Sequence, residues 1–224
     1  MKRTLETMLA VALAAVALPA LAGDVEGKIT YNGAPPKLSP MKTNRDQKVC
    51  GNEIPDESVE VKGKALENVV VTIEGPGIQK PAPVTVKLDQ LGCRYRPHVL
   101  AAPAGSTLDI INSDPLLHNI HGYLGQQTLF NVAMPIKGQQ IPKPLPRKGL
   151  VHVKCDVHSW MNGWIVVTDG LYAVVGEDGS YAIKGVPAGS YTVQAWHEKL
   201  GNKTQAVTVP ASGPVTANFD FTGG

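Results

Sequence analysis

The sequence of 224 residues has few charged and few aromatic side chains, with 21 basic and 19 acidic residues, three Trp, three Phe and six Tyr. This near-neutral balance argues against nucleic acid as a partner, because nucleic-acid-binding domains present clusters of Lys and Arg. No stretch after residue 22 is apolar enough to cross a bilayer. We therefore expect no nucleic-acid partner and no stable membrane span in the mature chain.

Cysteine is scarce, and the motif Cys-x-x-Cys-His does not occur, so covalently attached c-type haem is not indicated. There are three cysteines, Cys50, Cys93 and Cys155, and an odd number leaves one outside any internal disulfide. Gly and Pro are plentiful by contrast, at 23 and 18 residues, which suits short strands joined by many turns.

The first 22 residues have the pattern of a secretory signal peptide. Lys2 and Arg3 precede an apolar stretch at 7–22, which ends in the A-x-A cleavage site Ala20-Leu21-Ala22. A retained anchor is the alternative. Cleavage places the chain in the periplasm or outside the cell, where disulfides persist. That compartment favours a structural disulfide between Cys50 and Cys93.

Short apolar runs rich in β-branched residues recur along the chain and end in turn formers, whereas no amphipathic helix is found after residue 22. They lie at 68–75, 84–89, 98–102, 106–112, 150–154 and 163–169. The pattern predicts an all-β fold of the sandwich or Greek-key class. We expect irregular structure at 33–64, where the disulfide would tie the segment down, and again at 135–146.

The sequence pattern changes near residues 168–171, after which strand-like runs alternate with turn-forming residues. The stretch "DGSYAIKGVPAGSY" (178–191) resembles the carboxypeptidase regulatory-like domain, and the resemblance implies a small transthyretin-like β-sandwich without activity. The family's opening strand is similar to "DVEGKITYNG" (24–33), and the sequence leaves open whether that strand joins the C-terminal module. We expect four parts, namely a signal peptide at 1–22, an N-terminal strand and irregular segment at 23–94, a core at 95–168 and the C-terminal module at 169–224.

Soft side chains gather in "VHVKCDVHSWMNGWIVV" (151–167). Strand alternation turns Cys155 toward the core with the valines, and the following turn brings His158 and Met161 back toward the thiolate. Cys, His and Met in a partly buried pocket select copper, and a His2Cys site with a weak axial Met lacks only a second histidine. His118, which follows the strand at 106–112, can supply it.

Two segments, "YRPHVLAAPAGSTLDIINSDPLLHN" and "CDVHSWM", together resemble the cupredoxins, with spacing most similar to amicyanin. The resemblance covers about residues 95–167. It implies a cupredoxin-like Greek-key β-sandwich that binds one type 1 copper ion through His118, Cys155, His158 and Met161 and carries one electron. We expect Asn119 to stabilise the thiolate through hydrogen bonds toward the Cys155 loop. We expect His121, on the opposite side of the strand, to lie beside the site or at the surface.

Plainer interpretations remain open for several of these residues. Cys155 could be an inert buried thiol, or a nucleophile paired with His158. We expect His98 to support the site from outside the ligand set or to lie at the surface, His152 to be an exposed strand residue, and His197 to be structural or at a domain contact. Five basic residues and no acidic residue fall between Asp114 and Asp156, namely Lys137, Lys143, Arg147, Lys148 and Lys154. They form either a solvated loop or a basic rim that steers an acidic redox partner.

The sequence thus favours an exported electron carrier that is not an enzyme and that exchanges electrons with a partner protein. Two other functions stay open, a copper-delivery protein without redox turnover and an adhesion or scaffold protein with a structural metal.

Overall fold

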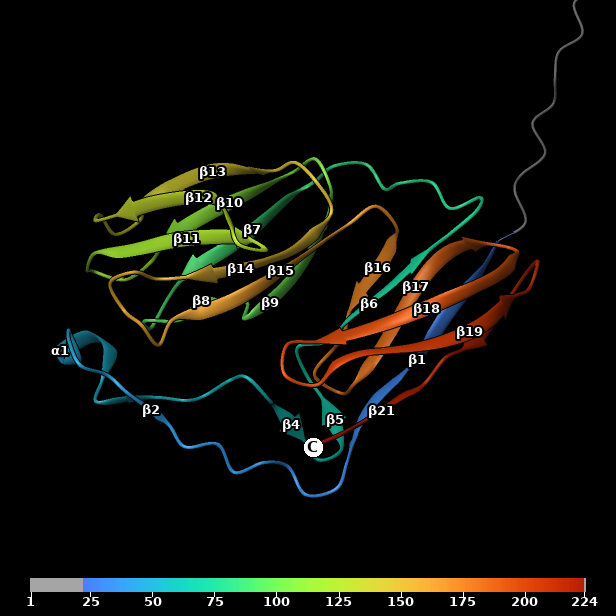
Figure 1. Ribbon diagram of the computed structural model, residues 1–224, viewed down its shortest axis with the longest axis horizontal. Coiled ribbons are helices and arrows are strands. Elements are labelled where there is room, and N and C mark those ends of the chain that lie inside the picture. Colours follow the sequence, from blue (N-terminus) through green and yellow to red (C-terminus); the bar gives the residue numbers. More distant parts are fainter. Residues whose placement is uncertain (1–21, 224) are drawn as a thin grey trace, which may run out of the picture.

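The computed structural model describes residues 22–223 and consists of two β-sandwiches (Figure 1). Apart from Ala22, the expected signal peptide lies outside the described residues. In the described part of the chain the one α-helix is α1, Gln47–Cys50, and none is long and apolar enough to cross a membrane. The chain is therefore all-β, as its short β-branched runs predict.

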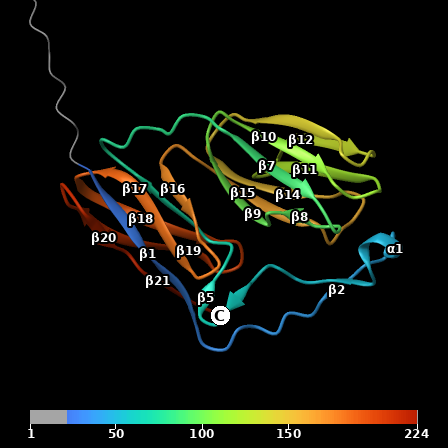
Figure 2. The ribbon, with the colours of Figure 1, turned by 180° about the vertical axis from the view of Figure 1, so that it is seen from behind.

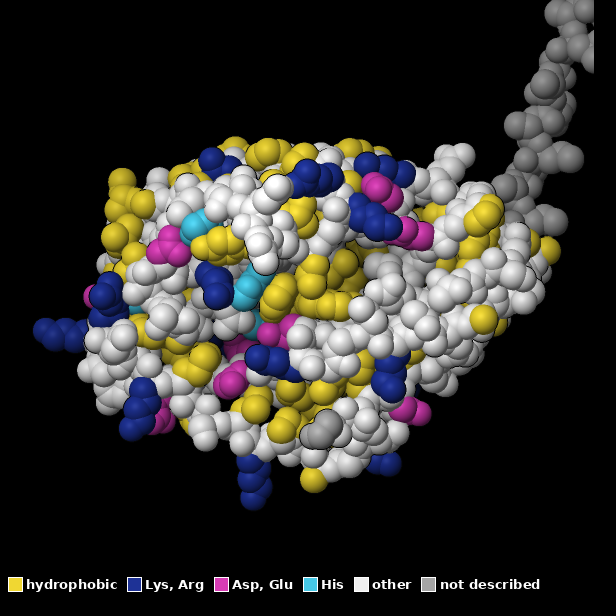
Figure 3. All heavy atoms as spheres, in the orientation of Figure 1, with side chains coloured by type: hydrophobic (Ala, Val, Ile, Leu, Met, Phe, Trp, Pro, Cys, Tyr) yellow, Lys and Arg dark blue, Asp and Glu magenta, His cyan; other side chains and the backbone are white. Residues whose placement is uncertain are grey.

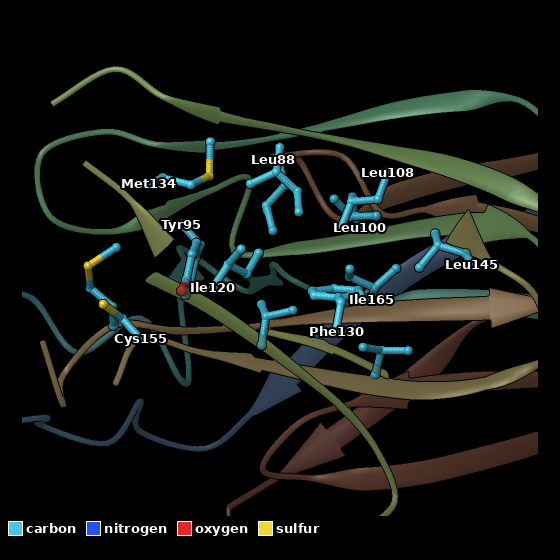
Figure 4. Packing of buried hydrophobic residues seen from close by; sticks show 14 of the residues in the cluster. Leu88, Tyr95, Leu100, Leu108, Ile120, Phe130, Met134, Leu145, Cys155 and Ile165 are labelled. Carbon is cyan, nitrogen blue, oxygen red and sulfur yellow. The ribbon is translucent and has the colours of Figure 1, made fainter. Parts of the chain in front are cut away.

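The first sandwich packs a four-stranded sheet, in the order β13-β10-β7-β8, against a five-stranded sheet, β12-β11-β14-β15-β9. The smaller sheet contains β7 (Thr85–Gln90), β8 (Tyr95–Arg96), β10 (Ser106–Asn112) and β13 (Gln140–Leu145). The larger contains β9 (Val99–Pro103), β11 (His118–Leu124), β12 (Gln127–Met134), β14 (Gly149–Lys154) and β15 (Asn162–Thr168). Apolar side chains that alternate along these strands fill the core between the sheets, and Cys155 lies at one end of it (Figure 4).

The second sandwich has one sheet in the order β17-β1-β5-β4, in which β20 and β21 also pair with β1, and another in the order β16-β6-β18-β19. The first sheet contains β1 (Ala22–Asn32), β4 (Val61–Lys62), β5 (Ala65–Leu66), β17 (Ser180–Pro187), β20 (Pro214–Thr216) and β21 (Phe219–Thr222). The second contains β6 (Val70–Glu74), β16 (Leu171–Val174), β18 (Gly189–His197) and β19 (Gly201–Val209).

The second sandwich is built from two distant stretches of chain. Strand β1 pairs antiparallel with β17 and parallel with β20 and β21, so the strand whose partner the sequence left open joins the C-terminal module. Strand β6 also belongs there, because it pairs with β16 and β18. The two cores therefore do not follow the boundaries 23–94, 95–168 and 169–224, and the first sandwich is inserted between two parts of the second.

The segment between β1 and β4 leaves the second sandwich, reaches the far end of the first and returns, as both ribbon views show (Figures 1 and 2). It carries only α1 and the two-residue strands β2 (Met41–Lys42) and β3 (Glu53–Ile54), in agreement with the irregular structure expected at 33–64. Its helix lies at the end of the first sandwich where the loop after β14 turns.

The stretch 135–146 is more regular than expected, because β13 pairs with β10 over six residues despite Pro142 and Pro144. Strand β13 is at the edge of its sheet. Because Pro142 and Pro144 are two residues apart, their backbone nitrogens face the same side of the strand. On the outer side of an edge strand there is no partner strand, so the missing N–H donors cost no ladder hydrogen bond. An edge position therefore tolerates a sequence that reads as irregular.

The two sandwiches contact each other through a small apolar cluster of Val70, Val99 and Ala101, with Trp164 and Trp196 packed against it. The indole rings of Trp164 and Trp196 meet edge to face, with centroids 5.7 Å apart. Next to them, Glu198 accepts a hydrogen bond from Trp164 Nε1 at 3.0 Å and pairs with the buried His98.

Candidate metal centre

The loop between β14 and β15 folds back on itself and buries three soft side chains. The backbone N–H of Cys155 donates to the carbonyl of Met161 at 3.2 Å, and the N–H of Met161 donates to the carbonyl of His158 at 2.9 Å. His158 is fully buried, and Cys155 and Met161 are only 4 % and 2 % exposed. The antiparallel pairing of β14 and β15 therefore closes a tight loop that holds all three residues inside the end of the sandwich.

His118, the first residue of β11, faces this loop from the neighbouring strand. Its Nδ1 lies 3.1 Å from Nδ1 of His158, and Nδ1 of His158 lies 3.7 Å from Sγ of Cys155. The ligand atoms of the three residues all lie within 4.8 Å of one another. One sulfur and two imidazole nitrogens thus converge on one buried point.

Two N–H groups point at the sulfur of Cys155. The backbone N–H groups of Asn119 and His158 each donate to Sγ at 3.4 Å. The side-chain oxygen of Asn119 also accepts a hydrogen bond from the backbone N–H of Asp156 at 3.1 Å. Asn119 therefore joins the strand of His118 to the loop of Cys155 in the way the sequence suggested.

The surroundings of Cys155 favour its thiolate. Burial alone would raise the pKa of the thiol, but hydrogen bonds from His118, His158 and the backbone of Asn119 outweigh it and lower the pKa to about 6. Burial of His118 opposes its protonation, yet hydrogen bonds to Asp114 and Cys155 raise its pKa. The site is therefore ready to offer a deprotonated sulfur, the form that binds soft metals.

Each histidine uses its other ring nitrogen to contact a carboxylate. Nε2 of His118 lies 2.8 Å from Oδ2 of Asp114, and Nε2 of His158 lies 2.9 Å from Oδ2 of Asp46. Both contacts leave Nδ1 facing the sulfur. Sequence reasoning found neither carboxylate. The position of Asp114 in the Asn-x-Asp loop before His118 was a usable signal, whereas nothing in the sequence near Asp46 points to a histidine 112 residues away.

Met161 lies in the same loop and is only 2 % exposed. His121 lies elsewhere, because it is three residues after His118 on β11 and turns to the other side of the sheet. Its Nδ1 lies 3.1 Å from Asp156, and its ring stacks on Tyr123 with centroids 4.0 Å apart. The structure thus brings His118, and not His121, to Cys155.

The expected disulfide between Cys50 and Cys93 is present, with Cα atoms 5.4 Å apart, and Cys155 is free. A second group of close donors contains Cys93, Asp114 and His118. It cannot form an independent metal site, because the sulfur of Cys93 is bonded to Cys50 and the other two residues contact each other.

The remaining histidines lie between the two sandwiches or beside that contact. His98 pairs with Glu198, and His152 stacks on Trp164 with centroids 4.0 Å apart. His197 is buried, which lowers its pKa to about 4, and its Nδ1 accepts hydrogen bonds from the N–H groups of Lys199 and Leu200. His197 is structural, as expected, whereas His98 is buried at the contact between the sandwiches and His152 is half-buried rather than exposed.

The five basic residues do not form one rim around the site. Arg147 and Lys148 precede β14 and Cys155 follows it, so they lie at opposite ends of a strand about 20 Å long. Lys148 pairs with Glu74 at 2.5 Å, and Arg147 donates to Gln127 at 2.9 Å. Lys and Arg side chains are spread over both sandwiches on the face in Figure 3 rather than gathered at one end.

The donor set fits copper. One thiolate and two imidazoles are the ligand types of a copper–thiolate site, and the two imidazoles face each other through Nδ1. The carboxylates that contact the other ring nitrogens are the supporting contacts that such ligands usually have. The fit rests on this chain's own distances.

No family model matches the sequence, and no curated protein matches it. Among solved structures the chain is similar to a purple cupredoxin from Nitrosopumilus maritimus, with 22% identity over 37% of this chain and 99% of that chain and a TM-score of 0.34. It is also similar to a reduced amicyanin variant, with 24% identity over 44% and 98% of the two chains and a TM-score of 0.35. A third similar structure is the copper-containing nitrite reductase of Thermus scotoductus, with 21% identity over 64% of this chain and 28% of that chain and a TM-score of 0.33. With TM-scores this low, these likenesses carry no argument about the site.

Proposed function

We propose that this chain is an exported type 1 copper protein that carries one electron at a time between partner proteins. The observation that carries the proposal is the convergence of Cys155 Sγ and the Nδ1 atoms of His118 and His158 at a buried point. Met161 is the proposed weak axial ligand. When bound, copper supplies a one-electron couple between Cu(I) and Cu(II).

The residues around this point are suited to hold one geometry in both oxidation states. N–H groups from Asn119 and His158 hold the sulfur, and carboxylates hold the rings of His118 and His158. These groups are packed at the end of a dense β-sandwich core, so they have little freedom to rearrange. Small rearrangement favours fast electron transfer.

A carrier fits better than an enzyme or a nucleophilic thiol. Cys155 is only 4 % exposed, and both histidines beside it are fully buried. A substrate could not reach Sγ without displacing packed side chains, whereas an electron needs no opening. We therefore propose that the chain is not an enzyme.

The partner surface that we propose is apolar. Four of the exposed large apolar side chains lie on α1 and on three loops around the site, namely Val49, Leu91, Leu117 and Ile136. Hydrogen bonds from Ser113 N–H to the Gln90 carbonyl and from Gly138 N–H to the Asn112 carbonyl join these loops. Apolar surface favours a redox partner that docks here by burying area. The scattered basic residues offer less support for the acidic partner that the sequence suggested.

The visible spectrum of the copper-loaded protein tests the function. We expect an intense thiolate-to-Cu(II) band that bleaches on reduction and returns on oxidation, and loss of that band in Cys155→Ser, whose hydroxyl is a poor soft ligand. Tight copper binding without the band or without reversible bleaching would instead favour copper delivery or a structural metal, and the carrier proposal would be abandoned.

A further inference from the structure

The outer ring edge of His158 is covered by a segment from far earlier in the chain. Residues 41–57, here called the cover, run across the end of the first sandwich beside the loop after β14 (Figures 1 and 2). The side chain of His158 has no exposed surface, while that of Asp46, which contacts its Nε2, is 45 % exposed. Asp46 therefore stands between the histidine and solvent.

The backbone of the cover fixes the position of Asp46. Asp46 precedes α1 in the left-handed conformation, with φ 51° and ψ 29°, and its carbonyl accepts hydrogen bonds from the N–H groups of Val49 and Cys50 at 2.9 Å. The hydroxyl of Thr43 donates to the carbonyl of Gly51 at 2.6 Å and closes the turn. The carboxylate is thus held by a compact turn rather than by a free loop.

The disulfide connects the carboxylates behind the two histidines. Cys50, bonded through its N–H to the Asp46 carbonyl, is bridged to Cys93. The N–H of Cys93 donates to Oδ2 of Asp114 at 2.7 Å, and Asp114 contacts His118. A closed ring of contacts therefore runs from His158 through Asp46, the disulfide and Asp114 to His118.

We propose that Asp46 is a positioning residue for the metal centre and that the Cys50–Cys93 disulfide holds it in place. Its carboxylate accepts the Nε2–H of His158, so the lone pair of Nδ1 is directed at the site, and it closes the ring edge to solvent. The proposal deepens the proposed function, and the contact itself exists without any metal. It implies that the cover shields the His158 ring, so that electron partners dock on the apolar side chains around it, Val49 of α1 included, without touching the ring.

Nuclear magnetic resonance of the metal-free protein tests the contact independently of copper. We expect a slowly exchanging Nε2–H signal from His158 in the wild type and its loss in Asp46→Gly, because glycine adopts φ 51° without strain and removes only the side chain. Asp46→Asn also tolerates this conformation, keeps an oxygen acceptor and should restore the signal. Glu53→Gln, an exposed change in the same cover, is the matched control. A wild-type exchange rate in Asp46→Gly would overturn the proposal.

Copper loading then tests whether the contact positions the ligand. Loss of a hydrogen-bond partner behind a ligating histidine costs about 10- to 100-fold in metal affinity, so copper should bind that much more weakly to Asp46→Gly than to wild type. The reduction potential should rise in both Asp46 variants, because a nearby negative charge stabilises Cu(II), and it should stay constant in Glu53→Gln. Unchanged affinity and potential in Asp46→Gly would show that Asp46 only covers the surface. A wild type without the thiolate band would refute the proposed function while leaving the signal from His158 to be judged by itself.

The double variant Cys50→Ser/Cys93→Ser tests the role of the disulfide. If the disulfide holds Asp46, its removal should speed exchange of the His158 Nε2–H even though Asp46 is present. Exchange as slow as in wild type would show that the hydrogen bonds of the turn suffice and would refute this part of the proposal. If the variant does not fold, mild reduction of the folded wild type with the same exchange measurement gives the answer.

Discussion

His118 and His158 approach each other through the same ring atom, with their Nδ1 nitrogens 3.1 Å apart, while the Nε2 of each meets a carboxylate. The two rings come from elements that are not consecutive in the chain: His118 lies on strand β11 and His158 lies in the loop after β14. Their shared orientation is therefore a property of the folded sheet and of the carboxylates behind them. A site held in this way is organised before a metal arrives.

Cys155 should be the one thiol that a small reagent alkylates under non-reducing conditions. Because Cys155 is only 4 % exposed, the reaction should be slow, and its rate should follow a low pKa. The reactive form is the thiolate, so the alkylation rate of the metal-free protein should rise with pH through about 6. In denaturant the midpoint should return to the ordinary value of about 8.5. Mass spectrometry identifies the site, and labelling of Cys50 or Cys93 in the native protein would contradict the assignment.

Replacement of the two histidines of β11 should give opposite results. His118→Ala removes a nitrogen that faces Cys155, so the copper protein should lose its thiolate band and regain it only with added imidazole. His121→Ala removes a ring that contacts Asp156 and Tyr123 and should keep the band. Visible absorption of both variants with equal Cu(II) makes the comparison. A colourless His121→Ala would show that the copper lies on the other side of β11.

Met161→Gln should keep a coloured site and lower its reduction potential. The proposed axial bond is weak, so the thiolate and imidazoles retain the metal, and a harder oxygen donor favours Cu(II) over Cu(I). Titration with redox mediators measures the potential. Complete loss of copper from this variant would mean that Met161 holds the metal rather than tuning it.

Gly122→Ala should destabilise the first sandwich by about 1–3 kcal/mol, the usual cost of overpacking. A Cβ at this position would lie 2.5 Å from the ring of the buried Phe130, which fills the space beside β11. Denaturant unfolding at unchanged m-value measures the difference. Gly176→Ala, whose Cβ comes no closer than 3.3 Å to any of its neighbours, is the control. Equal midpoints for both variants would refute the packing argument.

Much of the first sandwich could be predicted because most of its strands show a local sequence pattern, either alternating apolar residues or a short apolar run. The run at 106–112 alternates buried and half-buried residues over its whole length, and short apolar runs mark β7, β9, β14 and β15. Strand β13 was missed because its prolines conceal an edge strand. The membership of β1 and β6 in the second sandwich could not be deduced, since pairing partners more than 100 residues apart leave no local signal.

The sequence by itself determined that the protein is all-β and that a thiol, an imidazole and a thioether share one loop, because these rest on composition and on spacings of a few residues. It also predicted the pair Cys50 and Cys93, because Cys155 belongs to that loop and leaves only two cysteines. Strand alternation and the cupredoxin resemblance also favoured His118 over His121. Only the tertiary structure decided how the two sandwiches share the chain and that Asp46 and Asp114 contact the outer nitrogens of the two rings. Those features depend on strand register and on long-range packing, where a shift of one residue turns every side chain to the other face. The loop at 155–161 therefore supplies the soft donor atoms, and the fold supplies the carboxylates of Asp46 and Asp114 that contact the histidine rings.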